Sequence, residues 1–241
     1  MKICLASTSD KQFIKDIDKT PYILESFYYI QDWQIPLIQK AKFFVLDSGA
    51  FTFFTSKQDT NWDKYLTSYI NFIKKNNIDN FFELDIDCLV GYDKVLQLRK
   101  RLEQETGKKC IPVWHKSRGK EEFIKMCEEY NYVAIGGIVS KEITSKEYPF
   151  FTWFIKEAHK RGCKIHGLGF TSIKELPKYK FDSVDSTSWK SGGRFGQLHI
   201  FKNNSIVSIK PKNVRAKDYR QIDLNNYKEW IKFVNYADKN L

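Results

Sequence analysis

The amino-acid sequence predicts an α/β fold, and within that class a minimal (β/α)8 TIM barrel, from three observations. Short apolar runs alternate with longer amphipathic segments along most of the chain, and this alternation builds a parallel sheet covered by helices. Eight such runs occur in 241 residues, which suits a barrel. Several are continuously apolar, as strands buried on both faces are. We expect one domain over residues 1–241, with a C-terminal extension over residues 198–241.

Each strand predicted from the sequence is a short apolar or β-branched run. The eight runs are Lys2–Ala6, Tyr22–Glu25, Phe43–Asp47, Phe81–Ile86, Cys110–His115, Tyr132–Ile138, Lys164–Leu168 and Ser183–Ser186. The helices expected between them have apolar residues at three- and four-residue spacing. They are Trp62–Lys75, Tyr92–Thr106, Lys120–Tyr130 and Glu147–Arg161. Gly107 and Gly162 stand where such helices end.

The C-terminal tail has a different pattern from the rest of the chain. Residues 199–209 predict a hairpin that turns at Asn203 and Asn204, because asparagine tolerates the left-handed backbone of a tight turn. Tyr227–Ala237 has apolar residues on one face and predicts a closing helix.

Net charge and cysteine usage bound the function. Forty basic against 29 acidic side chains give a net charge of +11, which favours a polyanionic partner such as nucleic acid. A lysine-rich solvated surface is the alternative interpretation. The five cysteines are scattered and form no C-x-x-C pair, which argues for a reduced compartment and against a metal site built on cysteine. No apolar run reaches the ~18 residues of a membrane span, and no signal peptide precedes the first strand. A cytoplasmic location is expected.

Polar residues gather at the carboxyl ends of the predicted strands, where barrels carry their chemistry. In order they are Asp47 and Ser48, Asp85 and Asp87, Trp114 and His115, Gly136 and Gly137, His166, and Asp185. An unpaired charge beside a buried sheet is energetically costly. The presence of charged or polar residues at so many strand ends therefore predicts a functional site. The alternative is that these residues are structural. An aspartate at a strand end often caps the next helix, and this applies above all to Asp87 and Asp182. His115 and His166 could be core histidines with satisfied hydrogen bonds.

Glycine and aromatic residues near these ends suggest a planar ligand. Gly49 and the pair Gly136-Gly137 would let such a ligand approach the backbone closely. Phe51 could stack on the ligand, although an ordinary core position is equally consistent with the sequence.

Together these motifs resemble the tRNA-guanine transglycosylase superfamily, (β/α)8 enzymes that exchange guanine for a 7-deazaguanine base. Asp47-Ser-Gly-Ala-Phe51 is similar to the family's D-S-G-G-[FY] motif. Gly136-Gly-Ile138 resembles its G-G-L segment, with Glu142 where the family often has a glutamate, and His166-Gly-Leu-Gly169 resembles M-G-[VI]-G. Phe181-Asp-Ser-Val-Asp185, followed by Gly193-Arg-Phe-Gly-Gln197, matches the last motif without a gap.

The resemblance implies a role for each matching residue. Asp185 would be the nucleophile, with Asp182 a structural aspartate upstream, and Asp47 the acid/base. Asp85, or Asp87 as its rival, would read the purine edge. The other expected substrate-binding residues are Phe51 and His166, which would stack on the base, with Ser48, His115, Gly136, Gly137 and Ile138. Arg194, Lys190 and Gly193 would hold the nucleic acid. No metal and no cofactor are expected.

The departures from the family are as informative as the matches. The tRNA enzymes carry a C-x-C-x-x-C…H zinc site after the barrel, and this chain has no cysteine after Cys163. Trp114-His115 replaces a Q-G pair that touches the base in the family. This pattern resembles the DNA-guanine transglycosylase branch of bacteria and phages, which implies DNA and a free 7-deazaguanine (preQ0-like) base as partners. The alternatives are the same exchange on tRNA, a base or nucleoside hydrolase, and a non-catalytic nucleic-acid-binding barrel.

Overall fold

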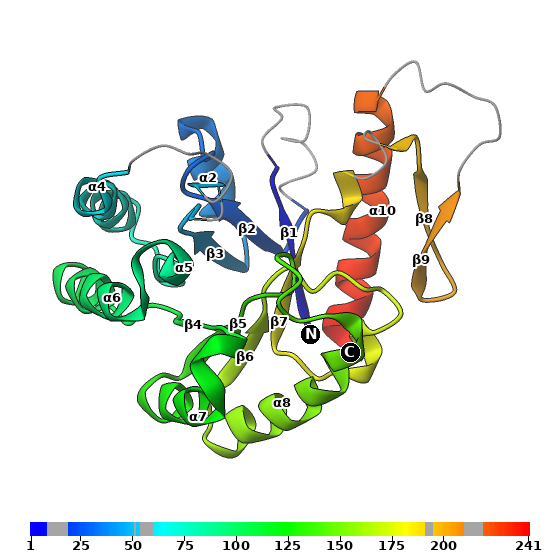
Figure 1. Cartoon of the computed structure of the whole chain (residues 1–241). Coiled ribbons are helices and arrows are strands. Elements are labelled where there is room, and N and C mark those ends of the chain that lie inside the picture. The colour runs from blue at the N-terminus through cyan, green and yellow to red at the C-terminus, as the bar shows by residue number, and fades with distance from the viewer. Residues whose placement is uncertain (9–18, 51, 54–59, 191–194, 210–218) are drawn as a thin grey trace.

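A curled sheet of seven parallel strands forms the centre of the protein (Figure 1). The structure is a computed structural model that describes residues 1–8, 19–50, 52–53, 60–190, 195–209 and 219–241. The strands are β1 Lys2–Ala6, β2 Tyr22–Ser26, β3 Phe43–Asp47, β4 Val113–Trp114, β5 Tyr132–Ile135, β6 Lys164–Gly167 and β7 Ser183–Ser186. Their order is β3-β2-β1-β7-β6-β5-β4, so β1 and β7, the first and last of these seven strands along the chain, pair with each other in the middle of the sheet. The predicted α/β class and parallel sheet are confirmed.

The segment predicted as the strand Phe81–Ile86 is reduced to two isolated bridges. Leu46 of β3 pairs with Phe81, and Phe82 pairs with Ile111, two residues before β4. Beyond them the chain turns, and the amide of Ile86 donates to the carbonyl of Leu84. β4 is shorter than predicted, because Pro112 has no N–H to donate to a neighbouring strand.

Helices lie around the outside of the curled sheet (Figure 1). They are α2 Ile35–Ile38, α4 Trp62–Lys75, α5 Asp87–Val90, α6 Tyr92–Thr106, α7 Gly119–Glu129, α8 Phe151–Lys160 and α10 Tyr219–Asn240. The predicted limits of α4 and α6 are confirmed. The predicted helix Glu147–Arg161 begins instead as a 3-10 turn over Ser145–Phe150, because proline at position 149 disfavours an α-helix just before it. None of the helices described is both long and apolar enough to cross a membrane.

The C-terminal extension packs beside β1. A hairpin of β8 Leu198–Lys202 and β9 Ser205–Ile209 turns at Asn203 and Asn204, whose φ angles are 52° and 60°. The predicted hairpin is therefore confirmed. α10 begins earlier and ends later than the predicted helix, and it covers β1 and β8 (Figure 1).

Candidate active site

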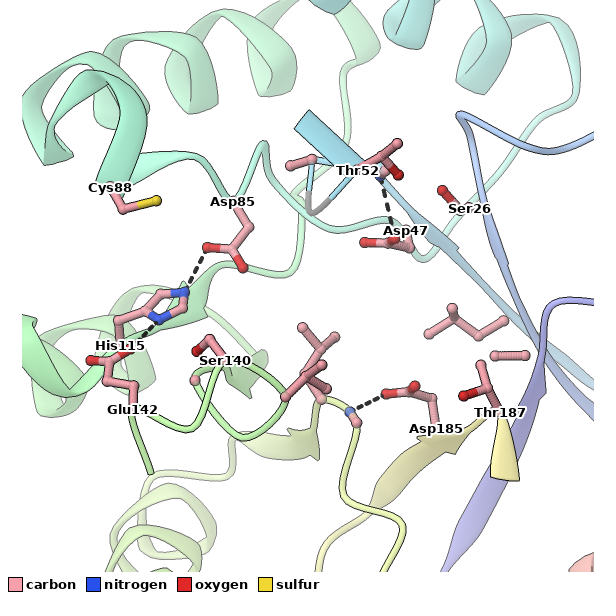
Figure 2. A pocket seen from close by; sticks show the side chains of 18 of the residues that line it. Ser26, Asp47, Thr52, Asp85, Cys88, His115, Ser140, Glu142, Asp185 and Thr187 are labelled. Carbon is pink, nitrogen blue, oxygen red and sulfur yellow. Dashed lines mark hydrogen bonds and ion pairs between the residues drawn. The ribbon is translucent and has the colours of Figure 1, made fainter. Parts of the chain in front are cut away.

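A cavity of about 1260 Å³ opens at the carboxyl ends of the strands (Figure 2). It collects polar side chains from loops that are far apart in the sequence. The candidates that line it are Asp47, Gly49, Asp85, Asp87, His115, Gly137 and Asp185. Figure 2 shows Asp47 and Asp185 on one side of the cavity and Asp85, His115 and Glu142 on the other.

Asp47 is the last residue of β3, and its carboxylate accepts a weak hydrogen bond from the amide of Gly49, 3.3 Å from Oδ2. Gly49 has a φ of +78°, and a Cβ there would lie 2.6 Å from Cβ of Tyr28, so glycine is required on both counts. Burial, reinforced by the negative charges of Asp185 and Asp85, raises the pKa of Asp47 from 3.8 to about 7. This group therefore holds a proton near neutral pH.

Asp185 lies on β7, and its carboxylate has two hydrogen-bond partners. The amide of Gly169 lies 2.6 Å from Oδ1, and Nε2 of His166 lies 3.2 Å from the same oxygen. The other ring nitrogen of His166 contacts the hydroxyl of Ser183. His166 is 0% exposed and lies outside the cavity lining, so the structure does not place it where it could stack on a base as expected, and its ring contacts Asp185 instead.

His115 bridges two carboxylates on the opposite side of the cavity. Its Nε2 lies 2.7 Å from Oδ1 of Asp85, and its Nδ1 lies 2.9 Å from Oε2 of Glu142 (Figure 2). Burial by itself lowers the pKa of His115, but the hydrogen bonds and charges of these carboxylates outweigh it and raise the pKa to about 9. The ring is thus an imidazolium at neutral pH, donating to both neighbours.

The two glycines after β5 make room for this bridge. A Cβ at Gly136 would lie 2.8 Å from the ring of His115, and one at Gly137 would lie 2.9 Å from Oε2 of Glu142. Gly136 is buried against the ring of His115 and is not among the residues that line the cavity. It therefore makes room for His115, whereas direct contact with a ligand was the expectation. Gly137 does line the cavity.

Asp87 is held in an ion pair. Nε and Nη2 of Arg118 lie 3.1 Å and 3.0 Å from its Oδ2, and the guanidinium stacks over Tyr92 with 4.2 Å to the ring centroid. Arg118 also lies 3.3 Å from Oε1 of Glu83, a fully buried carboxylate that a second arginine, Arg99, contacts at 2.6 Å. Every acid in this network therefore has a cation beside it.

Asp85, Asp87 and His115 lie close enough to share a metal ion, with one ligand atom of each within 4.8 Å of the others. As they stand, both nitrogens of His115 face carboxylates and Asp87 faces Arg118. A metal would have to displace these contacts and the proton of the imidazolium. The donor set as arranged is an ion-pair network.

The remaining candidates lie elsewhere. Ser48 is fully buried with its hydroxyl unpaired, Ile138 packs against the core, and Lys190 ends a turn after β7. None of the three lines the cavity. Phe51, Gly193 and Arg194 lie outside the described residues.

Asp182 accepts from the amide of Ile165 at 2.8 Å and contacts His159 at 2.9 Å, away from the cavity. This is the structural position expected of it. Sequence reasoning missed Arg118, whose only signal was its place three residues after a predicted strand end, and the cavity residues Ser26, Tyr29 and Val139.

Comparisons with known proteins show the fold alone. Neither the family models nor the curated proteins include a match to this chain. A Coccidioides immitis protein assigned as a fructose-1,6-biphosphate aldolase is similar in structure, with 11% identity, a TM-score of 0.59, and coverage of 99% of this chain and 90% of that one. An aldolase named QR15 has 12% identity and a TM-score of 0.50 over 78% of this chain and 89% of its own. Both are similar to the curled α/β sheet described above.

Proposed function

We propose that this protein is a glycosyltransferase that exchanges guanine in DNA for a 7-deazaguanine base. The observation that carries the proposal is the unlike pair of carboxylates in one cavity. Asp47 is buried with its pKa raised to about 7, while Asp185 accepts a hydrogen bond from the Gly169 amide and contacts the ring of His166. Two carboxyl groups whose environments differ in this way suit an acid/base and a nucleophile.

The exchange would take two steps on one sugar carbon. An oxygen of Asp185 forms a bond to C1′ while the bond from C1′ to guanine breaks, and Asp47 gives its proton to the departing guanine. The incoming 7-deazaguanine then loses its N9 proton to Asp47, and N9 attacks C1′ as the ester bond to Asp185 breaks. Asp47 ends protonated and Asp185 ends as a free carboxylate, so the cycle balances with no redox partner.

Base recognition would fall to the other side of the cavity. Oδ1 of Asp85 is occupied by His115, while Oδ2 has no hydrogen-bond partner among the described residues and can accept the purine N1–H and amine. The amide of Gly137, which lines the cavity, likewise donates no hydrogen bond among the residues described, which suits donation to O6. Asp87 is the weaker candidate, because Arg118 already engages it.

We also infer that the sheet closes into an eight-stranded barrel through Phe81 and Phe82. The amide of Phe82 donates to the carbonyl of Leu46 at 3.0 Å, and the amide of Ile111 donates to the carbonyl of Phe81 at 2.8 Å. The segment thus has backbone bonds to β3 on one side and to the chain before β4 on the other. This closure would place the ends of all eight strands around one cavity, as barrel enzymes require.

Aldol chemistry is the alternative that the structural neighbours raise. A Schiff-base aldolase needs a lysine nucleophile, and the described residues that line the cavity include none. The pair Asp47 and Asp185 has no assigned role in that chemistry, so base exchange accounts for more of the site.

The test is incorporation of radiolabelled guanine into nucleic acid. The protein is incubated with labelled guanine and either DNA or tRNA, and label retained in the polymer is counted. Label in DNA alone is expected. Label in tRNA alone would mean that the substrate is RNA. Release of guanine from a polymer without incorporation of label would indicate a hydrolase. No label in either polymer would overturn the proposal.

A further inference from the structure

The charges in the cavity decide which part of a polymer can enter it. Five acidic side chains line it against two cations among the described residues, and the acids outnumber the cations even when Asp47 is protonated. The acids are Asp47, Asp85, Asp87, Glu142 and Asp185, and the cations are His115 and Arg118. Phosphates would be repelled by this lining, so only the neutral base and sugar of a nucleotide suit the interior. The cavity of about 1260 Å³ also exceeds the ~300–1,000 Å³ of ordinary small-molecule pockets. The mouth must therefore meet the neighbouring nucleotides.

Two large apolar side chains line the cavity and yet remain exposed. Tyr29, which follows β2, is 56% exposed, and Val139, which follows β5, is 59% exposed. β2 and β5 are four strands apart in the sheet order, and four apart in the other direction through the Phe81–Phe82 segment. In a closed ring of eight, these strands face each other across the mouth.

Val139 is linked directly through a glycine to one of the two carboxylates of the proposed mechanism, and Tyr29 is linked to the other through its neighbour Tyr28. Val139 lies on Gly169, where a Cβ would be 2.3 Å from its Cγ2, and the Gly169 amide donates to Asp185. On the other side Tyr28 lies on Gly49, whose amide donates to Asp47. The rings of Tyr28 and Tyr29 then meet edge to face, with 4.9 Å between centroids.

Tyr28 and Tyr29 are also held in place by backbone and ring contacts. The amide of Tyr29 donates to the carbonyl of Ser26 at 3.0 Å, and Tyr28 packs edge to face on Phe53 at 5.3 Å. Phe53 in turn contacts Trp62 and Tyr65. An exposed aromatic held in one place is preorganised to stack on a flat partner.

We propose that Tyr29 and Val139 contact the two nucleobases that flank the exchanged nucleotide, and so hold the strand open on either side of it. This inference rests on the proposed base exchange. The flanking bases are uncharged and have apolar faces, while their phosphates stay outside the acidic interior. Stacking on base faces tolerates any sequence, so the contact selects a strand with unstacked bases and does not select a sequence motif.

The experiment compares two single-stranded DNA heptamers, one with ordinary bases beside a central guanine and one with abasic sites at both flanking positions. Tyr29→Ala and Val139→Ala should each raise KM for the ordinary heptamer about tenfold, the scale of one lost stacking contact. KM for free guanine should stay unchanged, and Tyr29→Phe should restore the wild-type value. On the abasic heptamer the wild type should lose a similar factor, and the alanine variants should lose little more.

Phe150→Ala is the matched control, because Phe150 is 58% exposed and does not line the cavity. Its KM values should equal those of the wild type. If Tyr29→Ala matches this control, or loses the same factor on the abasic heptamer, the inference is overturned. If the wild type exchanges guanine in no polymer, the proposed function fails instead. Binding of a fluorescent heptamer then decides the contact: about tenfold weaker binding by Tyr29→Ala supports it and equal binding overturns it.

Discussion

The two sides of the cavity treat their buried acids in opposite ways. Beside β2 and β3, burial is the largest influence on Glu25 and Asp47 and raises the pKa of each to about 7, although the charge of Lys190 lowers that of Glu25. Beside β4, Glu83, Asp85 and Asp87 each contact an arginine or the His115 imidazolium. Under the proposed mechanism, Asp47, which gains and loses a proton, has burial as its main influence, while the acids that bind or position each have a cation beside them.

The nucleophile should show the largest effect. Asp185→Asn is expected to reduce base exchange on the order of 10⁴-fold or more, because no carboxylate remains to form the bond to C1′. The covalent protein–DNA adduct on a denaturing gel should disappear with it. Asp182→Asn is the matched control and should keep the adduct, since Asp182 bonds His159 and the Ile165 amide away from the cavity. An adduct that survives in Asp185→Asn would place the nucleophile elsewhere.

Substitution of Asp47, the proposed general acid, should have the next largest effect on the rate of exchange. Asp47→Asn is expected to slow exchange by about 10²–10⁴-fold, the range for loss of a general acid. With a pKa of about 7, Asp47 loses its proton as the pH rises through neutrality, so the wild-type rate should fall above pH 7. The variant should lack this alkaline limb in a profile of rate against pH. A limb of equal height and position in the variant would remove Asp47 from the mechanism.

The compensated side should affect binding more than chemistry. His115→Gln is expected to raise KM for the free base about tenfold with a smaller change in kcat, because a glutamine cannot hold Asp85 and Glu142 with two charged hydrogen bonds. His159→Gln changes a histidine–aspartate pair outside the cavity and should leave KM unchanged. An equal fall in kcat and kcat/KM with KM unchanged would mean that His115 acts in the chemical step.

The contrast between the two sides also marks what the sequence could predict. Asp47 and Asp185 stand at or near the ends of short runs that the sequence predicts as strands, so their meeting at one edge of the sheet follows from the parallel fold alone. The partners of His115 and Asp87 could not all be predicted in this way, because Glu142 and Arg118 reach them from short turns after the strands. The sequence likewise predicts that His166 stacks on the ligand, because it indicates only that this residue lies at a strand end. Its burial beside Asp185 depends on packing against Ser183 and Phe82, which the sequence pattern does not show. The role of Gly136 could not be predicted for the same reason. The sequence suggests close approach of a ligand, but in the structure this glycine makes room for the side chain of His115.

Glu25 offers the smallest and most specific test of the comparison, through stability. Its side chain accepts from the amide of Thr8 at 2.8 Å and is 2% exposed, and burial raises its pKa from 4.5 to about 7. Between these values the folded state keeps a proton that the unfolded state releases, so the stability that Glu25 contributes is complete below pH 4.5 and is lost as the pH rises through 7. At 1.36 kcal/mol per pKa unit this amounts to about 3 kcal/mol.

Glu25→Gln should remove that part of the decline, and urea unfolding from pH 4.5 to 8 measures it. The free energy of unfolding should fall less steeply with pH in the variant than in the wild type, where Asp47 contributes in the same direction. Glu83→Gln should behave oppositely, lowering stability at every pH, because it leaves Arg99 and Arg118 without their buried partner. Parallel curves for Glu25→Gln and the wild type would mean that Glu25 is compensated after all, and the difference between the two sides would reduce to Asp47 alone.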